Sequence, residues 1–527
     1  MAEEFDAVFV GAGHNALAAA VHLASRGWSV GVFEKNDTAG GAARTEEATL
    51  PGFRHDLYAT NLGLFAGSGF FREHGEALGK HGLAFVPAED CFASPAPDGS
   101  WFGVSKDIEK TVARASSLSP ADAERWREMV AGFGADAPHL FALLSAPMGW
   151  RHLASLGWRA WRAKGTAGTL EMARFLASSP REFLERNFET PLIRAALGAW
   201  GMHLDFAPDV AGGALFPYLE GMVDQTMGMV IGKGGADTII KAMVARIEEL
   251  GGSVTTGAEV TEIRNRSGKS DGITLADGRQ ITARRAVIAG VTPGALVDRL
   301  LSGSQGSGQS TFDAGARKFR HGPGTMMVHL ALSGLPDWKA GDELKRFLYV
   351  HLAPDLDGMA RAYAEAMAGL LPRQPLLVVG QQTAVDPSRA PEGQHTLWVQ
   401  VRMVPGTIKG DAAGTIQATD WSEAGEAYAD RVIDLIEDYA PGTKAKILGR
   451  YVETPADLER RNPNLVGGDG IGGSHHLSQN FLFRPMPGWA RYRTPVKDLY
   501  LIGASTWPGG GLGAGSGYIL AKDLAGR

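Results

Sequence analysis

Residues 5–35 read FDAVFVGAGHNALAAAVHLASRGWSVGVFEK, and this stretch decides the fold. The apolar run Phe5–Val10 enters a tight turn at Gly11 and Gly13, and a helix with an apolar face follows. A second apolar run ends at the acidic Glu34. This order predicts a dinucleotide-binding βαβ unit, in which the glycines let the backbone approach a pyrophosphate and the carboxylate accepts hydrogen bonds from a ribose.

The start of the predicted helix, Asn15–Arg26, would present free N–H groups and the positive end of the helix dipole to a phosphate. A purely structural glycine turn is the alternative, but the strand, the helix and the acidic residue occur together in the expected order. We therefore predict that the unit binds a cofactor through Gly11, Gly13, His14, Asn15, Glu34 and Lys35.

A second glycine motif lies at Ala39–Thr45, shortly after Glu34. Its two adjacent glycines allow the chain to run tight against a further stretch of cofactor, and its arginine can meet phosphate oxygens. The alternative is a glycine-rich loop with a solvated arginine. The motif favours a flavin dinucleotide over a nicotinamide, and its candidate contacts are Gly40, Gly41, Ala42 and Arg44.

The carboxyl-terminal stretch carries a third motif, a buried strand that enters the glycine-dense segment Gly503–Gly517. The helix Tyr518–Leu524 follows, and N–H groups at such a helix start can hold the edge of a flavin ring. A flexible low-complexity tail is the alternative, but apolar segments on both sides of the glycines argue against it. The candidate contacts are Gly503, Ala504, Gly511 and Leu512.

Together these motifs resemble those of the flavoprotein amine oxidase and phytoene desaturase superfamily, most closely its phytoene dehydrogenase-related branch with carotenoid-ketolase-like members. The resemblance extends to Gly232–Gly235, Glu259–Val260, Val287–Gly290, Asn462–Asn464, Gly467–Asp469 and Arg484-Pro485. Two positions depart from the family pattern, because Ala42 replaces the usual arginine and Ala504-Ser505 replaces a frequent acidic residue. The resemblance implies a non-covalently bound FAD and adds Val260 and Gly290 to its contacts.

The predicted fold class is α/β, with a discontinuous Rossmann-type FAD-binding domain and an α+β substrate domain that carries a mostly helical insertion. The FAD-binding domain is expected from residues 1–65, 230–300 and 491–527. The substrate domain is expected from residues 66–229 and 301–490.

Local patterns predict individual elements within these domains. A β-meander with an Asp277-Gly278 turn is expected over residues 254–291, and an amphipathic helix over 421–439. A Gly/Ser-rich loop is expected over 300–310. Strands are expected over residues 325–332, 376–380 and 396–404.

The segment 140–194 mixes tryptophans with basic residues, namely Trp150, Trp158, Trp161, Arg151, Arg159, Arg162 and Lys164. On a helix this composition suits the bilayer interface. The other interpretation is a basic surface helix that packs its tryptophans into the core, as buried aromatic stripes commonly do. The family resemblance supports a membrane-facing or substrate-access region, because relatives take lipophilic polyenes from bilayers.

Catalysis in flavin oxidoreductases of this kind needs the flavin to take a hydride, while the protein supplies orientation and sometimes one acid or base. The catalytic candidates are His475, His476, Arg484 and Tyr58. Either histidine can accept a proton near neutral pH, and the alternative is that both hydrogen-bond a loop. His55 and Asp56 are second candidates, because the resemblance places their segment close to the isoalloxazine ring.

Composition excludes several classes of protein. A net charge of -6 gives no reason to expect a nucleic acid partner. The single cysteine, Cys91, forms no disulfide within the chain, which suits a reducing cytosol, and no His/Cys spacing resembles a zinc site, so we expect no metal. With no signal peptide and no run long enough to span a bilayer, we expect a cytoplasmic protein, with peripheral contact on the inner face of the membrane as a further option.

The resemblance implies an FAD-dependent oxidoreductase that dehydrogenates or desaturates an apolar, elongated, polyene or isoprenoid-like small molecule. One alternative is an amine-oxidase-like flavoenzyme on a small substrate, which would need an aromatic cage and often a lysine near the flavin. The other is a non-enzymatic prenyl or lipid escort protein of the same fold, which the intact Gly11, Gly13 and Glu34 disfavour. The electron acceptor and the oligomeric state have no signal in the sequence.

Overall fold

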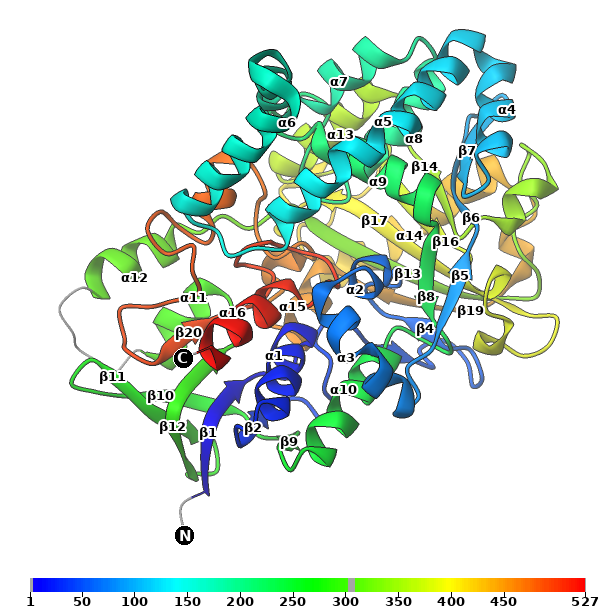
Figure 1. The fold of residues 1–527 in the computed structure, drawn as a ribbon. Helices are drawn as coiled ribbons and strands as arrows, with labels where there is room; N and C mark the ends of the chain where they lie inside the picture. The colour runs from blue at the N-terminus through cyan, green and yellow to red at the C-terminus, as the bar shows by residue number, and fades with distance from the viewer. Residues whose placement is uncertain (1–2, 302–308, 527) are drawn as a thin grey trace.

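The computed structural model describes residues 3–301 and 309–526. The chain forms two seven-stranded sheets and a helical region that lies beside the second sheet (Figure 1). Strands of the first sheet come from widely separated parts of the chain. The predicted α/β class with a discontinuous Rossmann-type domain is therefore confirmed.

The first sheet holds the amino-terminal βαβ unit near its centre. β1 (Glu3–Val10) runs parallel to β2 (Val30–Phe33) on one side and to β12 (Gln280–Ala289) on the other. The strand order is β10-β11-β12-β1-β2-β9, and β20 also pairs with β12. The other strands are β9 (Ser253–Thr255), β10 (Val260–Arg266), β11 (Lys269–Leu275) and β20 (Leu499–Leu501). The antiparallel series β10–β11–β12 confirms the predicted meander and its turn.

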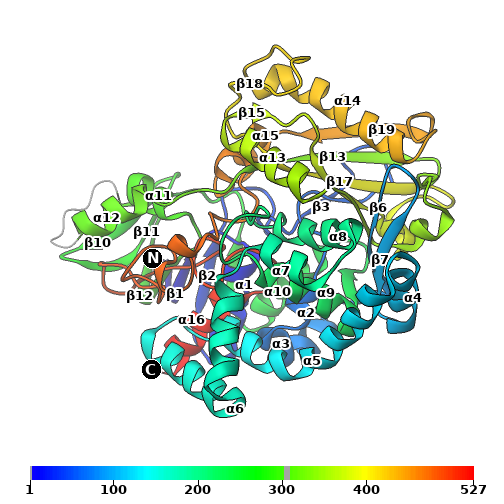
Figure 2. The same ribbon diagram turned by 90° about the horizontal axis from the view of Figure 1, so that it is seen from above.

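Helices cover one face of this sheet with small apolar side chains. They are α1 (His14–Ser25), α10 (Thr238–Glu249) and α16 (Gly515–Ala525), with α3 (Gly69–Lys80) beside α10. Helices α1 and α16 lie side by side in both views, so the first and the last helix of the chain are neighbours (Figures 1 and 2).

The loop predicted over residues 300–310 is wrong at both of its ends. Leu300 closes the short helix η1 (Leu296–Leu300), and α12 (Gln309–Arg317) begins before the expected end of the loop. Residues 302–308 of that prediction lie outside the described residues. Both ends are helical rather than loop because Leu296, Leu300 and Phe312 bury their apolar side chains against the meander.

The second sheet has the strand order β19-β13-β17-β16-β14-β6-β7. Its strands are β6 (Asp90–Pro95), β7 (Trp101–Ser105), β13 (Gly324–Leu332), β14 (Tyr349–Leu352), β16 (Leu376–Gly380), β17 (His395–Val404) and β19 (Ile447–Glu453). The amphipathic helix α14 (Trp421–Tyr439) packs on one face, which is apolar. The three strands and the helix predicted here are confirmed.

The helical region follows β7 in the chain. It comprises α4 (Ile108–Leu118), α5 (Pro120–Leu144), α6 (Trp150–Ala177), α7 (Pro180–Asn187), α8 (Pro191–Gly201) and α9 (Leu215–Met227). The shorter elements are β3 (Thr45–Glu46), β4 (His55–Asp56), α2 (Gly63–Ala66), β5 (Phe85–Ala88), β8 (Met229–Gly232), α11 (Pro293–Ala295), α13 (Leu356–Met367), β15 (Leu370–Leu371), β18 (Gly410–Asp411) and α15 (Pro455–Arg461). Residues 66–229 thus contribute strands to the second sheet as well as helices.

Helix α6 exposes its tryptophans. Trp150, Trp158 and Trp161 are 66%, 58% and 45% exposed, and the rings of the last two stack at 5.0 Å. The interpretation that they pack into the core is therefore wrong, because the helix projects from the body of the molecule and offers them no core (Figure 2). Among the described residues, no helix is both long and apolar enough to cross a bilayer.

A fully buried ion pair joins the two domains. The guanidinium of Arg389, in the connection between β16 and β17, lies 2.5 Å from the carboxylate of Asp56 and donates to the carbonyl of Gly232 at 2.7 Å. The second Asp56 oxygen accepts from the amide of Ala236 at 2.8 Å. Burial alone would raise the pKa of Asp56, but the charge of Arg389 and these hydrogen bonds hold it below its ordinary value. Asp56 therefore serves as an interdomain anchor.

Breaking this pair should destabilise the protein strongly. Arg389→Met leaves the Asp56 carboxylate buried without its cation, and we expect a loss of about 3–5 kcal/mol in the free energy of unfolding, measured by urea denaturation at pH 7. Because the folded-state pKa of Asp56 is lowered, this stabilisation is present at neutral pH and is lost as the pH falls through that pKa.

Two further variants make this test specific. Asp56→Asn combined with Arg389→Met removes both charges and should recover part of the loss. The control Arg279→Met breaks an exposed pair with Asp277 and should leave the urea midpoint unchanged. An Arg389→Met protein with the wild-type midpoint would contradict the anchoring role.

Candidate functional site

The turn between β1 and α1 lies at the carboxyl edge of the parallel strands, where ligands bind in open α/β sheets. Gly11 has a φ of +88°, a left-handed conformation that favours glycine. Gly13 has a φ of -69°, and a Cβ there would meet no protein atom within 4 Å. No described side chain caps the first N–H groups of α1. The turn therefore leaves open space above free amides, as a phosphate site requires.

Glu34, at the end of β2, is held beside this turn. One of its carboxylate oxygens accepts from the amide of Ala12 at 2.8 Å, and the other accepts from the amide of Asn36 at 3.0 Å. The side chain is buried, so these two bonds fix its direction. Each oxygen keeps a free lone pair, which can accept from a ribose hydroxyl.

The second glycine motif packs directly on the first. The amide of Gly40 donates to the carbonyl of Ala12 at 2.9 Å, and a Cβ on Gly41 would lie 3.4 Å from the Cα of Gly13. The guanidinium of Arg44 pairs with Glu46 beside this motif. The contact of Arg44 with phosphate stays a prediction.

The carboxyl-terminal glycine stretch closes on the same turn. The amide of Gly503 donates to the hydroxyl of Ser516 at 3.0 Å, and the amide of Gly517 faces Asn15. His14 hydrogen-bonds the backbone of Gly511, and burial lowers the pKa of His14 to about 4. The motifs at the two ends of the chain therefore meet at the start of α1.

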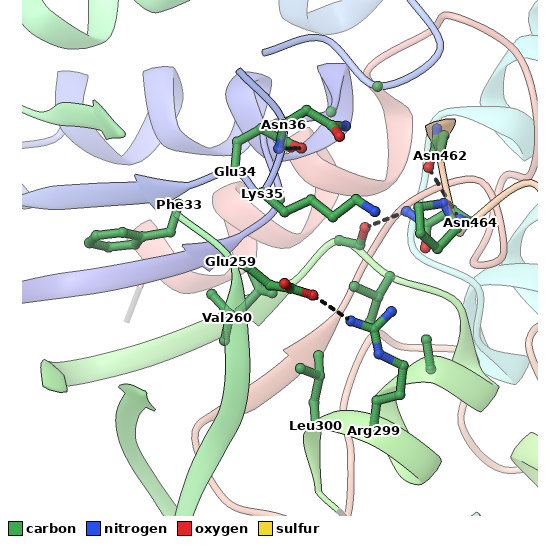
Figure 3. Close-up of a pocket in the computed structure, with 18 residues that line it drawn as sticks. Phe33, Glu34, Lys35, Asn36, Glu259, Val260, Arg299, Leu300, Asn462 and Asn464 are labelled. Carbon is green, nitrogen blue, oxygen red and sulfur yellow. Dashed lines mark hydrogen bonds and ion pairs between the residues drawn. The ribbon is translucent and has the colours of Figure 1, made fainter. Parts of the chain in front are cut away.

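A pocket lies beside the amino-terminal turn, and Figure 3 shows its lining, which among the described residues includes none of the carboxyl-terminal glycine stretch. Of the predicted contacts it brings together Gly11, Gly13, Glu34, Lys35, Gly41, Val260 and Gly290. Sequence reasoning assigned no contact role to Asn36, Glu259, Arg299, Asn462 and Asn464, which also line it. Asn464 donates to the carbonyl of Gly290 at 3.0 Å and accepts from the amide of Thr292 at 3.0 Å, so it ties this strand end to the pocket. The family resemblance included the segment Asn462–Asn464, but the sequence did not indicate that this segment would line the pocket.

These residues fit a dinucleotide. The open space above Gly13 and the uncapped amides of α1 suit a pyrophosphate, and the fixed carboxylate of Glu34 suits a ribose. Contact between the carboxyl-terminal glycine stretch and the remaining half of an FAD molecule stays a prediction. Ala42, Ala504 and Leu512 lie in these segments, and their contacts stay predictions.

The predicted catalytic histidines are tied to a loop. The amide of His475 and the imidazole of His476 both bind Asp205, at 2.7 Å and 3.3 Å. His475 Nε2 accepts from the amide of Gly510 at 3.2 Å. Burial, and then the charge of Arg484, hold the pKa of His475 far below its ordinary value. His475 is therefore neutral and supports the carboxyl-terminal glycine loop.

Arg484 organises the same loop from its buried position. Its guanidinium donates to the carbonyls of Gly472 at 2.7 Å, Ser474 at 2.9 Å and Ala504 at 2.7 Å. Burial lowers its pKa to about 10, so the group remains cationic at neutral pH. It places a buried positive charge beside a predicted cofactor contact, Ala504.

Tyr58 and His55 lie close to the second sheet. Burial, and then the charge of Glu453, raise the pKa of Tyr58 above its ordinary value, so its phenol stays protonated at neutral pH. His55 accepts or donates a hydrogen bond at Thr49 (2.8 Å), and its ring lies 5.3 Å from that of His329. Catalytic roles for Tyr58, His475, His476 and Arg484 stay predictions.

One face of the second sheet carries an unpredicted polar surface. Cross-strand register places on it Thr325, Met327, His329, Tyr349, His351, Trp398, Gln400, Arg402, Tyr451 and Glu453. This face packs toward α8 and residues 55–58, through contacts such as His351 Nε2 with His203 Nε2 at 3.1 Å. His329 is fully buried, and among the described residues neither of its ring nitrogens has a partner at hydrogen-bonding geometry. The alternation of Thr396, Trp398, Gln400 and Arg402 with aliphatic residues along β17 was the available signal.

Arg402 and two carboxyls add charge around this polar surface. Among the described residues no carboxylate lies within 4.0 Å of Arg402, and burial lowers its pKa to about 10. Glu220 and Asp224 stand one turn apart on α9, and their charges act on Tyr349. Burial raises the pKa of Glu220 to about 7 and that of Asp224 well above its ordinary value. The carboxyl of Glu220 can therefore exchange a proton near neutral pH.

Comparison with known families identifies the chemistry of the chain. Residues 139–436 match the family described as flavin containing amine oxidoreductase, and residues 10–69 match an NAD(P)-binding Rossmann-like domain. Together these matches confirm the expected resemblance. They also establish an FAD-dependent oxidoreductase with FAD as its cofactor.

Several characterised proteins are similar to the chain over nearly its full length. Pyridine nucleotide-disulfide oxidoreductase domain-containing protein 2 of Rattus norvegicus is 28% identical, over 99% of this chain and 94% of its own. One of the limonene dehydrogenase subunits of Castellaniella defragrans is 26% identical, over 99% and 95%. A neurosporene-forming phytoene desaturase of Rhodobacter capsulatus is 27% identical, over 98% and 93%.

Solved structures share the fold. A variant of putrescine oxidase superposes with a TM-score of 0.61 at 14% identity and covers 100% of this chain and 99% of its own. At this identity the likeness concerns the fold alone.

Substitutions at the turn should separate loss of FAD from loss of folding. In Gly13→Val the backbone conformation suits valine and the protein leaves the space free, so the variant should fold but bind no FAD. Gly134→Val, at an exposed and unobstructed position of α5, is the matched control and should keep wild-type FAD. The measurement is flavin absorbance per chain after gel filtration. A Gly13→Val protein with full FAD content would show that the nucleotide is misplaced.

Glu34→Ala should weaken FAD binding without abolishing it. Loss of charge-assisted hydrogen bonds is worth about 1.5–3 kcal/mol, which corresponds to a Kd raised about 10- to 150-fold. Fluorescence titration of the apoprotein with FAD measures this change. Glu34→Gln, which keeps one acceptor oxygen, should fall between Glu34→Ala and the wild type, and an unchanged Kd in Glu34→Ala would contradict the ribose contact.

Proposed function

The chain belongs to the flavin containing amine oxidoreductase family, and we propose that it dehydrogenates an apolar, elongated, isoprenoid-like substrate. The convergence of both chain ends on the start of α1 carries the cofactor part of this proposal. Similarity to a subunit of limonene dehydrogenase and to a phytoene desaturase over nearly the whole chain supports the substrate class. The intact glycine motifs disfavour a non-enzymatic escort protein.

Bound FAD supplies the acceptor for a hydride. The chain holds it through the free amides of α1 and the carboxylate of Glu34. Arg484 and His475 hold the carboxyl-terminal glycine loop in place through carbonyls and the amide of Gly510. The helices α8 and α9 cover the polar face of the second sheet and exclude water from it.

Substrate access is proposed through a hollow between α5, α6, α7 and α9. Its volume is about 590 Å³, and its apolar lining includes Met129, Leu140, Met172, Phe175 and Phe183. Lys164 of α6 also lines it, so the hollow lies beside the helix that exposes the tryptophans. The lining also carries charged side chains, among them Arg125, Glu128, Asp136, Glu171 and Arg186, so the apolar residues form only part of it.

An amine-oxidase-like reaction on a small polar substrate is the second candidate. The buried polar surface of the second sheet favours it, because buried imidazoles and a buried guanidinium suit a substrate with hydrogen-bonding groups. Tyr349 and Trp398 stack there with ring centroids 5.8 Å apart and planes 11° apart. This aromatic pair is the feature nearest to the cage that such a reaction needs.

Anaerobic reduction of the bound flavin distinguishes the two candidates. FAD-loaded protein is mixed with limonene, with phytoene in detergent, and with putrescine, and the absorbance of the oxidised flavin is followed. The proposal expects bleaching by the isoprenoid hydrocarbons and none by putrescine. Bleaching by putrescine alone would replace the proposal by the second candidate.

The exposed face of α6 should bind anionic membranes. Arg151, Arg159 and Arg162 are exposed beside the tryptophans, so replacing all three by Glu should reduce co-sedimentation with phosphatidylserine liposomes. The difference should be larger at low salt, because salt screens exposed charges.

The control for this experiment makes the same change in charge elsewhere. Arg266, Arg279 and Arg460 are exposed at sites away from α6, and replacing them by Glu should leave sedimentation unchanged. Equal losses in both triple variants would indicate a general charge effect. A wild type that never sediments with liposomes would remove the membrane contact from the proposal.

A further inference from the structure

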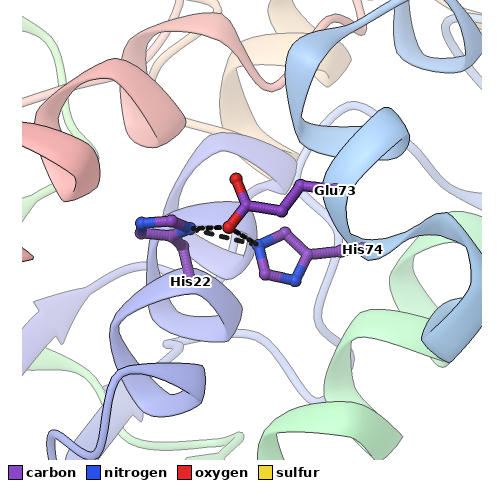
Figure 4. Close-up of side chains that lie close together, drawn as sticks. All are labelled: His22, Glu73 and His74. Atoms are coloured by element: carbon purple, nitrogen blue, oxygen red, sulfur yellow. Dashed lines mark hydrogen bonds and ion pairs between the residues drawn. The ribbon is translucent and has the colours of Figure 1, made fainter.

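Three potential metal ligands converge on the outer side of the nucleotide domain, away from the FAD pocket. His22 comes from α1, and Glu73 and His74 come from α3 (Figure 4). We propose that they bind one divalent transition-metal ion of the zinc type. Their donor atoms point toward one another across the interface of the two helices.

The spacing of the donor atoms matches a metal site. Nδ1 of His22 lies 3.1 Å from Nε2 of His74, and Oε1 of Glu73 lies 3.6 Å and 3.8 Å from these nitrogens. A point equidistant from the three atoms lies about 2.0 Å from each, which is the length of zinc–nitrogen and zinc–oxygen bonds, about 2.0–2.2 Å. The guanidinium of Arg26 has to leave Oε1 of Glu73 to admit the ion.

The chemistry of the ligands is also suitable. Both imidazoles are buried, and imidazole nitrogens beside a carboxylate are ligands that zinc prefers. One proton now joins the two rings in a hydrogen bond, and a metal ion would take its place. Glu73 is one-third exposed, at 32%, so an ion can arrive from solvent and keep a water as its fourth ligand.

Neighbouring groups bear on binding in opposite ways. The hydroxyl of Tyr518 donates to the other oxygen of Glu73, and its ring lies 5.2 Å from that of His22, so it orients the ligands. The guanidinium of Arg26 lies 2.9 Å from the same Oε1 that would bind the ion. Its side chain is 56% exposed and can move into water. Arg26 is therefore a competitor for Glu73, and removing it should strengthen metal binding.

A bound ion would tie α1 to α3. Because α1 begins at the pyrophosphate turn, the site would stabilise the helix that holds the cofactor. This role is structural and does not depend on the substrate.

Zinc binding by the untagged, FAD-loaded full chain tests the proposal. After removal of metals with a chelator, equilibrium dialysis against Zn²⁺ should give one tightly bound ion per chain and a raised thermal midpoint. His22→Ala and His74→Ala should lose the ion. Glu73→Gln keeps the buried pair of imidazoles and should fold as the wild type does. It should weaken zinc binding more than about tenfold, because removing even a group that hydrogen-bonds a metal ligand weakens binding by about that factor.

Two controls separate the metal site from a simple hydrogen-bonded cluster. His81→Ala removes a histidine paired with Glu249 at the end of α3 and should leave zinc binding unchanged. Arg26→Ala should tighten zinc binding, because it removes the competitor for Glu73. In a hydrogen-bonded cluster that binds no metal, the same change would only remove the ion pair between Arg26 and Glu73. A wild type that binds no zinc would overturn the proposal. Zinc uptake that survives His22→Ala and Glu73→Gln would also overturn it.

Discussion

A backbone contact between the two ends of the chain sets the geometry of the cofactor site. A Cβ on Gly517, in the first turn of α16, would come within 1.8 Å of the carbonyl oxygen of Asn15. Only glycine permits this approach. The contact therefore holds the start of α1 and the start of α16 together. The phosphate turn precedes one helix and the last glycine loop precedes the other, so the path of FAD between them depends on this contact.

The second domain is positioned against this site by buried charge. The pair of Asp56 and Arg389 links the glycine turn at 232–236 to the connection between β16 and β17. Because both charges are buried, the loss of one partner would leave the other charge uncompensated. The sheet beyond it has two different faces. The apolar face packs on α14 and gives stability, while the polar face looks toward the nucleotide domain.

Features encoded locally could be predicted from the sequence. The βαβ unit, the meander and the helix over 421–439 each depend on periodicity and turn residues within one short segment. Features made by distant segments could not. Nothing in the sequence around Asp56 indicates that its charge is balanced by Arg389. Nothing around His22 indicates that Glu73 and His74 lie beside it, so the sequence predicted no metal site.

Burial was the other weakness of sequence reasoning. A helix with tryptophans on a basic background has the same pattern whether it packs into a core or projects from it, and only tertiary structure exposes Trp158. Conversely, the residue types of His475 and Arg484 predict catalysis, and that role stays a prediction, while their burial and their hydrogen bonds to loop backbone could not be foreseen. Residue type identifies what a group can do, and burial with its partners decides what it does.

The central claim is that the motifs at both chain ends form one FAD site. The most direct measurement is the visible absorption spectrum of the purified full-length protein, followed by heat release and identification of the flavin. The account predicts an oxidised-flavin spectrum with about one FAD per chain. A colourless protein that takes up no FAD when soaked in it would contradict the account.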